Sequence, residues 1–126
     1  MSFEQIGSSF IEQYYTFFST QRPMLAGVYR PTSLLTWQNE QIQGAESIMA
    51  RFEQLQFNES VFKKDSVDCQ PLGTGVLVVV NGEVALQGER YALKFNDVFH
   101  LANEGQSWYI ANQIFNIVGG GTQMSE

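Results

Sequence analysis

The sequence predicts a single small α+β domain, in which helices pack into the concave face of a strongly curved antiparallel sheet around an apolar pocket. Apolar residues recur at helical spacing in the first part of the chain. From Phe57 onward the period shifts towards two, and glycine-containing turns separate the apolar stretches. With 126 residues, 44% of them hydrophobic, the chain matches one domain with one core, so we expect a single domain over residues 1–126.

The first predicted helix begins at the amino-terminal end of the sequence. Ser2 with Gln5 three residues later matches a capping box, so Ser2 is the expected N-cap. The pattern breaks at Pro23, because proline cannot continue a helix interior. The apolar stripe recurs at spacings of three and four residues and consists of Phe3, Ile6, Phe10, Tyr14 and Phe17.

Shorter elements are expected between Pro23 and the second helix. A helical turn should follow Pro23 and end at Pro31. Residues 34–37 are predicted to form a strand, and residues 42–44 either its return strand or a turn into the next helix. The stripe of that second helix consists of Ala45, Ile48, Met49, Phe52 and Leu55.

Four long strands are predicted in the remainder, at residues 57–68, 76–86, 91–101 and 108–117. Strands of about ten residues exceed the usual length of about five or six, which indicates a strongly twisted sheet. Both helical stripes need an apolar surface to cover, and one face of this sheet is the only candidate of sufficient size. A cup of this kind favours a pocket at its open end. We expect residues 119–126 to be a frayed tail.

The charge and cysteine content exclude several classes of function. Thirteen acidic against seven basic residues give a net charge of −6, which repels nucleic acid and anionic membranes. The same charge suits either a basic protein partner or simple solubility. A single cysteine allows no disulfide within the chain, and we find neither a signal peptide nor an apolar run of about 20 residues. We therefore expect a cytoplasmic or nuclear protein.

The sequence offers little for metal or cofactor chemistry. One histidine and one cysteine cannot assemble an ordinary zinc site. The Gly73-Thr74-Gly75 segment precedes a strand and lacks the lysine of a phosphate-binding loop, so we interpret it as a hairpin turn. Cys69 stands beside an acid rather than a base, which favours an inert thiol. We expect no metal and no cofactor.

Asp97 is the one candidate for acid–base catalysis. It shares a face of its predicted strand with Phe95 and Phe99, and an acid there is unusual. Pointing inward, Asp97 would have a raised pKa and suit a general base on an enolisable substrate. A β-bulge that turns Asp97 outward is the alternative, and it is the one we expect, because long curved strands often contain bulges. No tyrosine or second acid is clearly placed beside it by sequence.

The strand at residues 76–80 is apolar on both faces. Helices can cover one face, but the other needs a second cover, which predicts a homodimer formed through the sheets. His100 belongs to the alternate, more polar face of its strand, together with Lys94 and Asn96. We therefore expect His100 at the surface or at the dimer face.

A set of segments along nearly the whole chain stands in a familiar order and spacing. These segments are Phe3 to Ile11 with Tyr14-Tyr15, Leu35-Thr36-Trp37, Gln43-Gly44, Leu55-Gln56-Phe57, Gln70-Pro71, Phe95, Val98-Phe99, Asn112 and Ile114-Phe115. Together they resemble the nuclear transport factor 2 family. That resemblance implies a cone-shaped, cystatin-like fold and a homodimer without enzymatic activity. It also implies a carrier that takes the GDP-bound form of the GTPase Ran into the nucleus through the phenylalanine-glycine nucleoporins of the nuclear pore.

The resemblance also implies binding residues. An aromatic side chain of Ran enters an apolar pocket in this family, and nucleoporin repeats bind beside an aromatic residue that precedes Glu-Gln-Ile-Gly. Phe3 occupies that second position, where tryptophan is common. The pocket lining corresponds here to Trp37, Leu55, Leu93 and Phe115.

The acidic rim that this family presents to Ran is largely missing here. Glu40 and Glu89, with Glu83 nearby, restore part of the negative charge if the loop paths differ. We therefore expect weaker but detectable binding of Ran. Two alternatives remain: an adaptor of this fold that has lost Ran, and a small-molecule isomerase or dehydratase that uses Asp97. The residues standing in place of the family's acids are Gln38, Gly88, Arg90 and Gln113.

Overall fold

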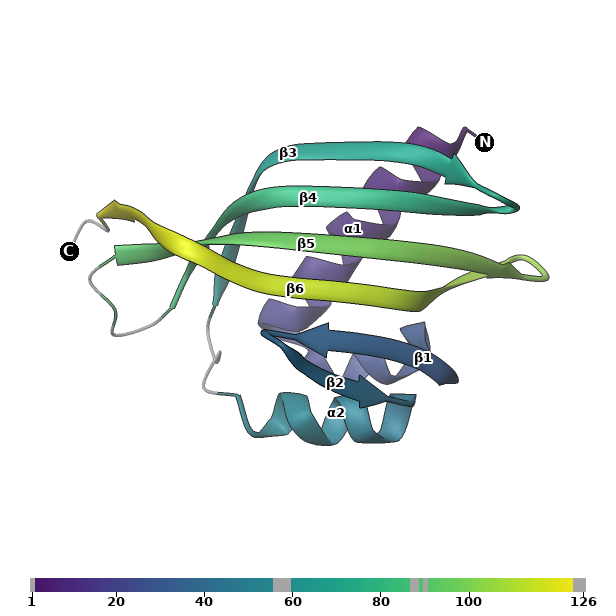
Figure 1. Ribbon diagram of the computed structural model, residues 1–126, viewed down its shortest axis with the longest axis horizontal. Coiled ribbons are helices and arrows are strands. Elements are labelled where there is room, and N and C mark those ends of the chain that lie inside the picture. The colour runs from purple at the N-terminus through teal and green to yellow at the C-terminus, as the bar shows by residue number, and fades with distance from the viewer. Residues whose placement is uncertain (1, 56–59, 87–88, 90, 124–126) are drawn as a thin grey trace.

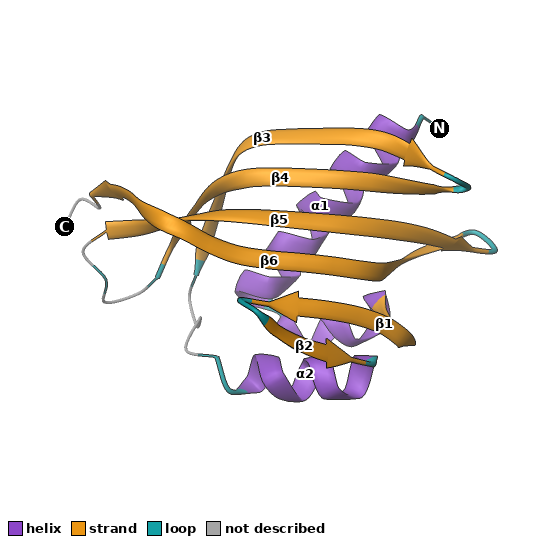
Figure 2. Ribbon diagram, viewed as in Figure 1, coloured by secondary structure: helices purple, strands orange, loops and turns teal. Residues whose placement is uncertain are grey.

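The structure is a computed structural model that describes residues 2–55, 60–86, 89 and 91–123 (Figures 1 and 2). Its strands form one six-stranded sheet in the order β2-β1-β6-β5-β4-β3. Helix α1 crosses one face of this sheet, and α2 lies beside the β1–β2 end (Figure 1). The elements are α1 (Phe3–Thr20), the 3-10 helix η1 (Arg22–Val28), β1 (Tyr29–Trp37), β2 (Glu40–Gln43), α2 (Ala45–Glu53), β3 (Val61–Leu72), β4 (Gly75–Ala85), β5 (Tyr91–Glu104) and β6 (Ser107–Gln123).

The α+β architecture of helices on a curved sheet is confirmed, but the sheet is mixed rather than wholly antiparallel. Strand β1 pairs with β6 in the parallel sense, while the other neighbouring strands pair antiparallel. The reason is the order of the strands along the chain. The β1–β2 hairpin precedes α2 in sequence, and the meander from β3 to β6 follows it and ends with β6 next to β1 in the middle of the sheet.

Helix α1 begins as its sequence predicts. The Ser2 hydroxyl accepts a hydrogen bond from the Gln5 backbone N–H at 3.2 Å, and the Gln5 side chain accepts one from the Ser2 backbone N–H at 3.1 Å. The buried stripe is turned by about one residue from the predicted one and brings Gly7 against Cys69 of β3 and Val78 of β4. Its members are Gly7, Ile11, Tyr14, Tyr15 and Phe18.

Several predicted boundaries are wrong. The helical turn ends at Val28, and Pro31 lies inside β1. Strand β6 continues through Gln123, where it pairs with Tyr91, so the backbone of residues 119–123 is ordered in the sheet instead of frayed. The expected start of β3 at residue 57 falls on residues 56–59, outside the described part of the chain.

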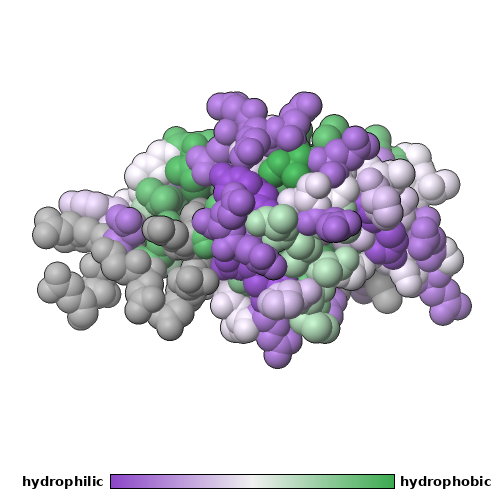
Figure 3. Space-filling model, turned by 90° about the horizontal axis from the view of Figure 1, so that it is seen from below, coloured by the Kyte–Doolittle hydropathy of each residue, from purple (hydrophilic) through white to green (hydrophobic). Residues whose placement is uncertain are grey.

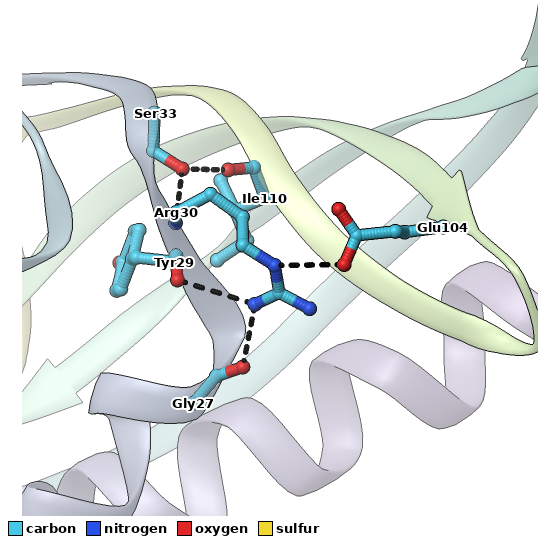
Figure 4. Close-up of polar contacts among 6 residues, drawn as sticks. All are labelled: Gly27, Tyr29, Arg30, Ser33, Glu104 and Ile110. Atoms are coloured by element: carbon cyan, nitrogen blue, oxygen red, sulfur yellow. Dashed lines mark hydrogen bonds and ion pairs between the residues drawn. The ribbon is translucent and has the colours of Figure 1, made fainter.

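A polar cluster holds the beginning of β1 against β6 (Figure 4). Pro31 has no N–H, and the β1–β6 register skips between Tyr29 and Leu34. The buried Ser33 hydroxyl spans this gap by accepting from the Arg30 N–H at 2.8 Å and donating to the Ile110 carbonyl. The Arg30 guanidinium adds hydrogen bonds to carbonyls at the end of η1. Side-chain polar groups thus replace the missing ladder bonds.

The core between α1, α2 and the sheet is strongly aromatic. Five phenylalanine side chains are almost fully buried, and they come from α1, α2, β5 and β6. They are Phe18, Phe52, Phe95, Phe99 and Phe115.

The surface that lies at the bottom of Figure 1 is mostly hydrophilic, and its apolar residues form separate patches (Figure 3). Among the described helices none is long and apolar enough to cross a membrane.

Gly7 sets how closely α1 approaches the sheet, which yields a first prediction. A Cβ atom at this position would lie 2.5 Å from the Cys69 sulfur and 3.0 Å from a Val78 methyl carbon. We expect Gly7→Ala to lower the free energy of unfolding by about 1–2 kcal/mol, because the overlap outweighs the ~1 kcal/mol gain in helix propensity. Urea denaturation measures the change.

A second substitution tests the cause of this loss. Adding Cys69→Ala removes the sulfur and should recover most of the lost stability, and Ser9→Ala on the exposed side of α1 serves as the control. Equal or higher stability of the Gly7→Ala variant alone would show that the helix is free to move away from β3.

Candidate functional site

Trp37 and Phe115 form the predicted pocket wall. Trp37 is the last residue of β1, and it pairs directly with Phe115 of β6. Their rings stack with centroids 4.1 Å apart and an interplanar angle of 13°. Phe18 lies nearly parallel to Trp37 at 6.2 Å. Both wall residues are almost fully buried, with 3% and 1% of their surface exposed. The wall is therefore rigid and is part of the core.

Leu55 and Leu93 complete the predicted pocket set. Both are half-buried and pack against the same core cluster that contains Trp37 and Phe115. Leu55 follows α2 and adjoins residues 56–59, while Leu93 lies near the start of β5, close in sequence to residues 87–88 and 90. These neighbours are outside the described residues, so the structure describes the wall of the predicted pocket and only part of its mouth.

The rim residues differ in how available their side chains are. Gln38 lies in the tight β1–β2 turn with a φ of +48°, and its N–H donates to the Phe115 carbonyl at 2.9 Å. Glu40 forms an ion pair with Arg51, with 2.8 Å between Oε1 and Nε. Glu89 is exposed. Arg90 and Gly88 lie outside the described part of the chain. Of the two acids expected to restore the rim, Glu40 is thus already paired with a cation.

Gln113 is not a rim residue, which corrects our placement. It is 1% exposed and lies on the inner face of β6. Its side-chain oxygen accepts from the Tyr29 hydroxyl at 2.6 Å, and its amide nitrogen donates to the Tyr14 hydroxyl at 3.2 Å. The hydroxyls of Tyr14 and Tyr29 are 2.9 Å apart. Since Tyr29 donates to Gln113, Tyr14 must donate to Tyr29, and the three residues close a ring of hydrogen bonds.

Asp97 joins this ring from β5. Its side chain is 1% exposed and accepts from the second N–H of Gln113 at 3.0 Å and from the Tyr15 hydroxyl at 2.9 Å. The expected outward bulge is therefore wrong. Each irregularity in the β5–β6 ladder inserts its extra residue into β6, such as Val118 opposite the Lys94–Phe95 step. The alternation of β5 stays intact, and Asp97 points inward.

Burial governs the ionisation of this network. It raises the pKa of Asp97 from 3.8 to about 8, and the hydrogen bonds from Gln113 and Tyr15 offset the rise only in part. Burial, followed by the nearby Asp97, raises the pKa of Tyr15 well above its ordinary value. Asp97 is therefore mostly protonated at neutral pH.

Sequence reasoning missed the residues that surround Asp97. Tyr14 and Tyr15 belong to α1, Tyr29 begins β1 and Gln113 lies in β6, so 82 residues separate Tyr15 from Asp97. The unbroken alternation of β5 was the one available signal that the acid points inward. Nothing in the sequence identified which tyrosines meet it.

The remaining candidate residues lie apart from this network. Phe3 is in the first turn of α1 with 36% of its surface exposed. His100 lies on the opposite face of β5 from Asp97, with its Nδ1 3.1 Å from the Asn112 side-chain oxygen. Burial raises the pKa of the Cys69 thiol, which does not favour a nucleophile. No cluster of three metal-ligating side chains occurs among the described residues.

Helices packed on one face of a curved six-stranded sheet, with an aromatic wall between them, are the architecture of the nuclear transport factor 2-like class of proteins. The nuclear transport factor 2 (NTF2) domain family matches this chain over residues 6–117. Nuclear transport factor 2B of Arabidopsis thaliana is 42% identical over 117 residues, which cover 90% of this chain and 93% of that protein. The chain belongs to the nuclear transport factor 2 family.

Two further comparisons agree. Nuclear transport factor 2 of Eremothecium gossypii is 36% identical over 119 residues, covering 93% of this chain and 95% of that protein. The solved structure of nuclear transport factor 2 from Cryptosporidium parvum is 40% identical and superposes with a TM-score of 0.87, covering 92% of this chain and 94% of that one. The similarity therefore extends over nearly the full length of both partners.

The raised pKa of Asp97 predicts how stability depends on pH. The unfolded carboxyl ionises above pH 3.8, whereas the folded carboxyl keeps its proton until about pH 8. The folded state binds more protons in this window, so the Asp97 contribution is fully present below pH 3.8 and is lost as pH rises to 8. Between pH 3.8 and 8 we expect the free energy of unfolding of the wild type to fall by about 2 kcal/mol or more relative to that of Asp97→Asn, whose amide mimics the neutral acid.

Denaturant titrations of both proteins at several pH values measure this difference. Asp97→Ala provides the contrast, since it leaves Tyr15 and Gln113 with buried unsatisfied groups and should destabilise by roughly 2–4 kcal/mol at all pH values. Parallel pH profiles of the wild type and Asp97→Asn would show that Asp97 is ionised in the folded protein.

Proposed function

We propose that this protein is a dimeric, non-enzymatic carrier that binds the GDP form of the GTPase Ran and phenylalanine-glycine nucleoporin repeats. It would move between cytoplasm and nucleus through the nuclear pore. The similarity to proteins named nuclear transport factor 2, over at least 90% of this chain and of each relative cited above, supports a role in nuclear transport. The single observation that carries the finer proposal is the aromatic wall of Trp37 and Phe115 beside an exposed turn.

The wall suits an incoming aromatic side chain. Trp37 lies nearly parallel to both Phe18 and Phe115, so its position is fixed before a partner arrives. Leu55 and Leu93 are half-buried, so they are the members of the set whose surface an incoming side chain would contact first, with the buried Trp37 and Phe115 behind them. A large aromatic anchor in a preformed apolar pocket contributes roughly 2–4 kcal/mol in typical interfaces. This is the expected contribution of a Ran side chain.

The charges at the rim favour weak rather than tight binding of Ran. Glu40 is paired with Arg51, and Gln38 supplies no charge to the turn beside Trp37. Gln113 is buried in the core and cannot meet a partner. Glu89 is exposed and forms no ion pair with the described residues. Because close charge pairs contribute a few kcal/mol to such interfaces, a reduced acidic rim weakens binding without removing the apolar anchor.

The exposed side chain of Phe3 is the proposed contact for nucleoporin repeats. The capped first turn of α1 holds it at the surface with 36% of its area exposed. An aromatic ring on an ordered helix offers a phenylalanine repeat an apolar face at little entropic cost. Weak, rapidly reversible contacts of this kind suit passage through the pore.

The outer face of the sheet is the proposed dimer interface. Val79, Val98 and Ile114 form one aliphatic row across β4, β5 and β6, and Ile114 is 46% exposed. A row of asparagines runs beside it, in which Asn96 donates to Asn81 at 2.9 Å. Helix α1 covers the opposite face through the buried residues described above. An apolar row on a sheet face without a helix favours packing against a second sheet.

The burial and hydrogen bonds of Asp97 favour a structural role for this side chain rather than a catalytic one. A general base must contact the proton that it removes, but Asp97 is 1% exposed and both of its oxygens accept hydrogen bonds from Tyr15 and Gln113. An isomerase or dehydratase activity would require this network to open. The adaptor alternative, in which the protein has lost Ran, is favoured only by the reduced acidic rim.

Calorimetric titration with Ran tests the proposal. At physiological salt we expect binding to the GDP form and none to the GTP form. Glu40→Gln together with Glu89→Gln should weaken that binding by about tenfold or less, because one of the two acids is already paired. Glu12→Gln, on α1 away from the rim, is the matched control. An unchanged affinity of the double variant would rule out these acids as the rim.

Titration with a phenylalanine-glycine repeat peptide separates the carrier from the adaptor. Peptide binding that weakens in Phe3→Ala, without any binding of Ran in either nucleotide state, would establish the adaptor. Binding of neither partner would refute both. Circular dichroism of each variant confirms that the fold is retained.

Analytical ultracentrifugation tests the dimer. We expect a dimer at micromolar concentration that dissociates in Ile114→Asp, since a charge in the aliphatic row has to be desolvated on association. Val61→Asp, an exposed position on edge strand β3, is a control for added charge. A wild-type protein that sediments as a monomer at this concentration contradicts the interface.

A further inference from the structure

A pocket of about 490 Å³ lies between the outer side of α1 and the beginning of β3. None of the residues predicted to contact Ran lines it, so it is separate from the wall formed by Trp37 and Phe115. Its inner side is aromatic, with Tyr15 and Phe62 stacked at a centroid distance of 4.7 Å. Its volume falls within the range of small-molecule sites, which is about 300–1,000 Å³.

One buried polar atom beside this pocket has no partner among the described residues. The Ser60 side chain is 1% exposed, and its Oγ makes no hydrogen bond to any residue in the part of the chain that the structure describes. It is the one buried side-chain polar atom of this kind found among those residues. A buried hydroxyl without a partner destabilises a fold, and alanine or valine would fill the position without this penalty. Because Ser60 lines the pocket, rotation of its side chain about the Cα–Cβ bond would bring this hydroxyl to a ligand that completes its hydrogen bond.

The remaining lining indicates the chemistry of that ligand. Thr16, Ser19 and Thr20 present hydroxyl groups from α1, and the threonine protons are already donated to helix carbonyls. Their oxygens remain able to accept. An aromatic inner wall with hydroxyls around it suits a flat apolar body that carries one polar group.

The ion pair at this pocket makes a charged ligand unnecessary. Lys64 Nζ of β3 lies 2.7 Å from Glu12 Oε2 of α1, so the pair bridges the two elements that form the pocket. The two charges neutralise each other, so neither needs a charged group of a ligand as its counterion. We propose that this pocket between α1 and β3 binds an uncharged, planar aromatic molecule whose hydroxyl or carbonyl group hydrogen-bonds to Ser60.

Titration with 2-naphthol, followed by amide NMR, tests the proposal. We expect saturable shifts confined to residues 12–20 and 60–64. Ser60→Ala should weaken binding by roughly fivefold, because one hydrogen bond to the ligand is lost. The same substitution should raise the melting temperature of the free protein, since it removes an unpartnered buried hydroxyl. Opposite effects on affinity and stability distinguish a binding role of Ser60 from a purely structural one.

Two comparisons complete the design. Ser107→Ala, at an exposed position in β6, should change neither the affinity nor the melting temperature. The anion 2-naphthoate should bind more weakly than 2-naphthol, because Lys64 is already paired. Shifts outside the pocket, no saturable shift at all, equal affinity in Ser60→Ala, or tighter binding of 2-naphthoate would each overturn the proposal.

Discussion

The closed set of hydrogen bonds among Tyr14, Tyr15, Tyr29, Asp97 and Gln113 is the constraint on which the rest of the structure depends. It joins α1, β1, β5 and β6 inside an otherwise apolar core. Each buried polar group that loses its partner costs about 1–3 kcal/mol, so only one rotation of α1 over the sheet satisfies the whole set. Apolar packing alone tolerates several rotations. The polar network therefore selects the helix position that the hydrophobic effect stabilises.

The aromatic wall depends on the same arrangement. Phe18 is one helical turn beyond Tyr14, and it can lie parallel to Trp37 only when α1 has the rotation that the network imposes. Strand β1 brings Trp37 beside Phe115, and Ser33 bridges the gap in the β1–β6 ladder. A wall fixed in this way would lose little entropy on binding a partner, which suits the proposed carrier role.

Much of the fold could be predicted from sequence because helical and strand periods are local properties. The capping box at Ser2, both helices and the long strands of the meander follow from residues close together in the chain. The parallel pairing of β1 with β6 could not be predicted, since it joins residues about 80 positions apart. The family resemblance supplied the pocket set, but it placed Gln113 on the rim, whereas β6 turns that side chain into the core.

The sequence by itself determined the type and order of the elements, the apolar face of β5, the net charge of −6 and membership of the nuclear transport factor 2 family. Only the tertiary structure decided the raised pKa of Asp97 and the lack of a hydrogen-bond partner for Ser60 among the described residues. Both properties depend on which distant groups exclude water and which supply a hydrogen bond. Residue order fixes what a side chain can donate or accept, but folding fixes what it meets.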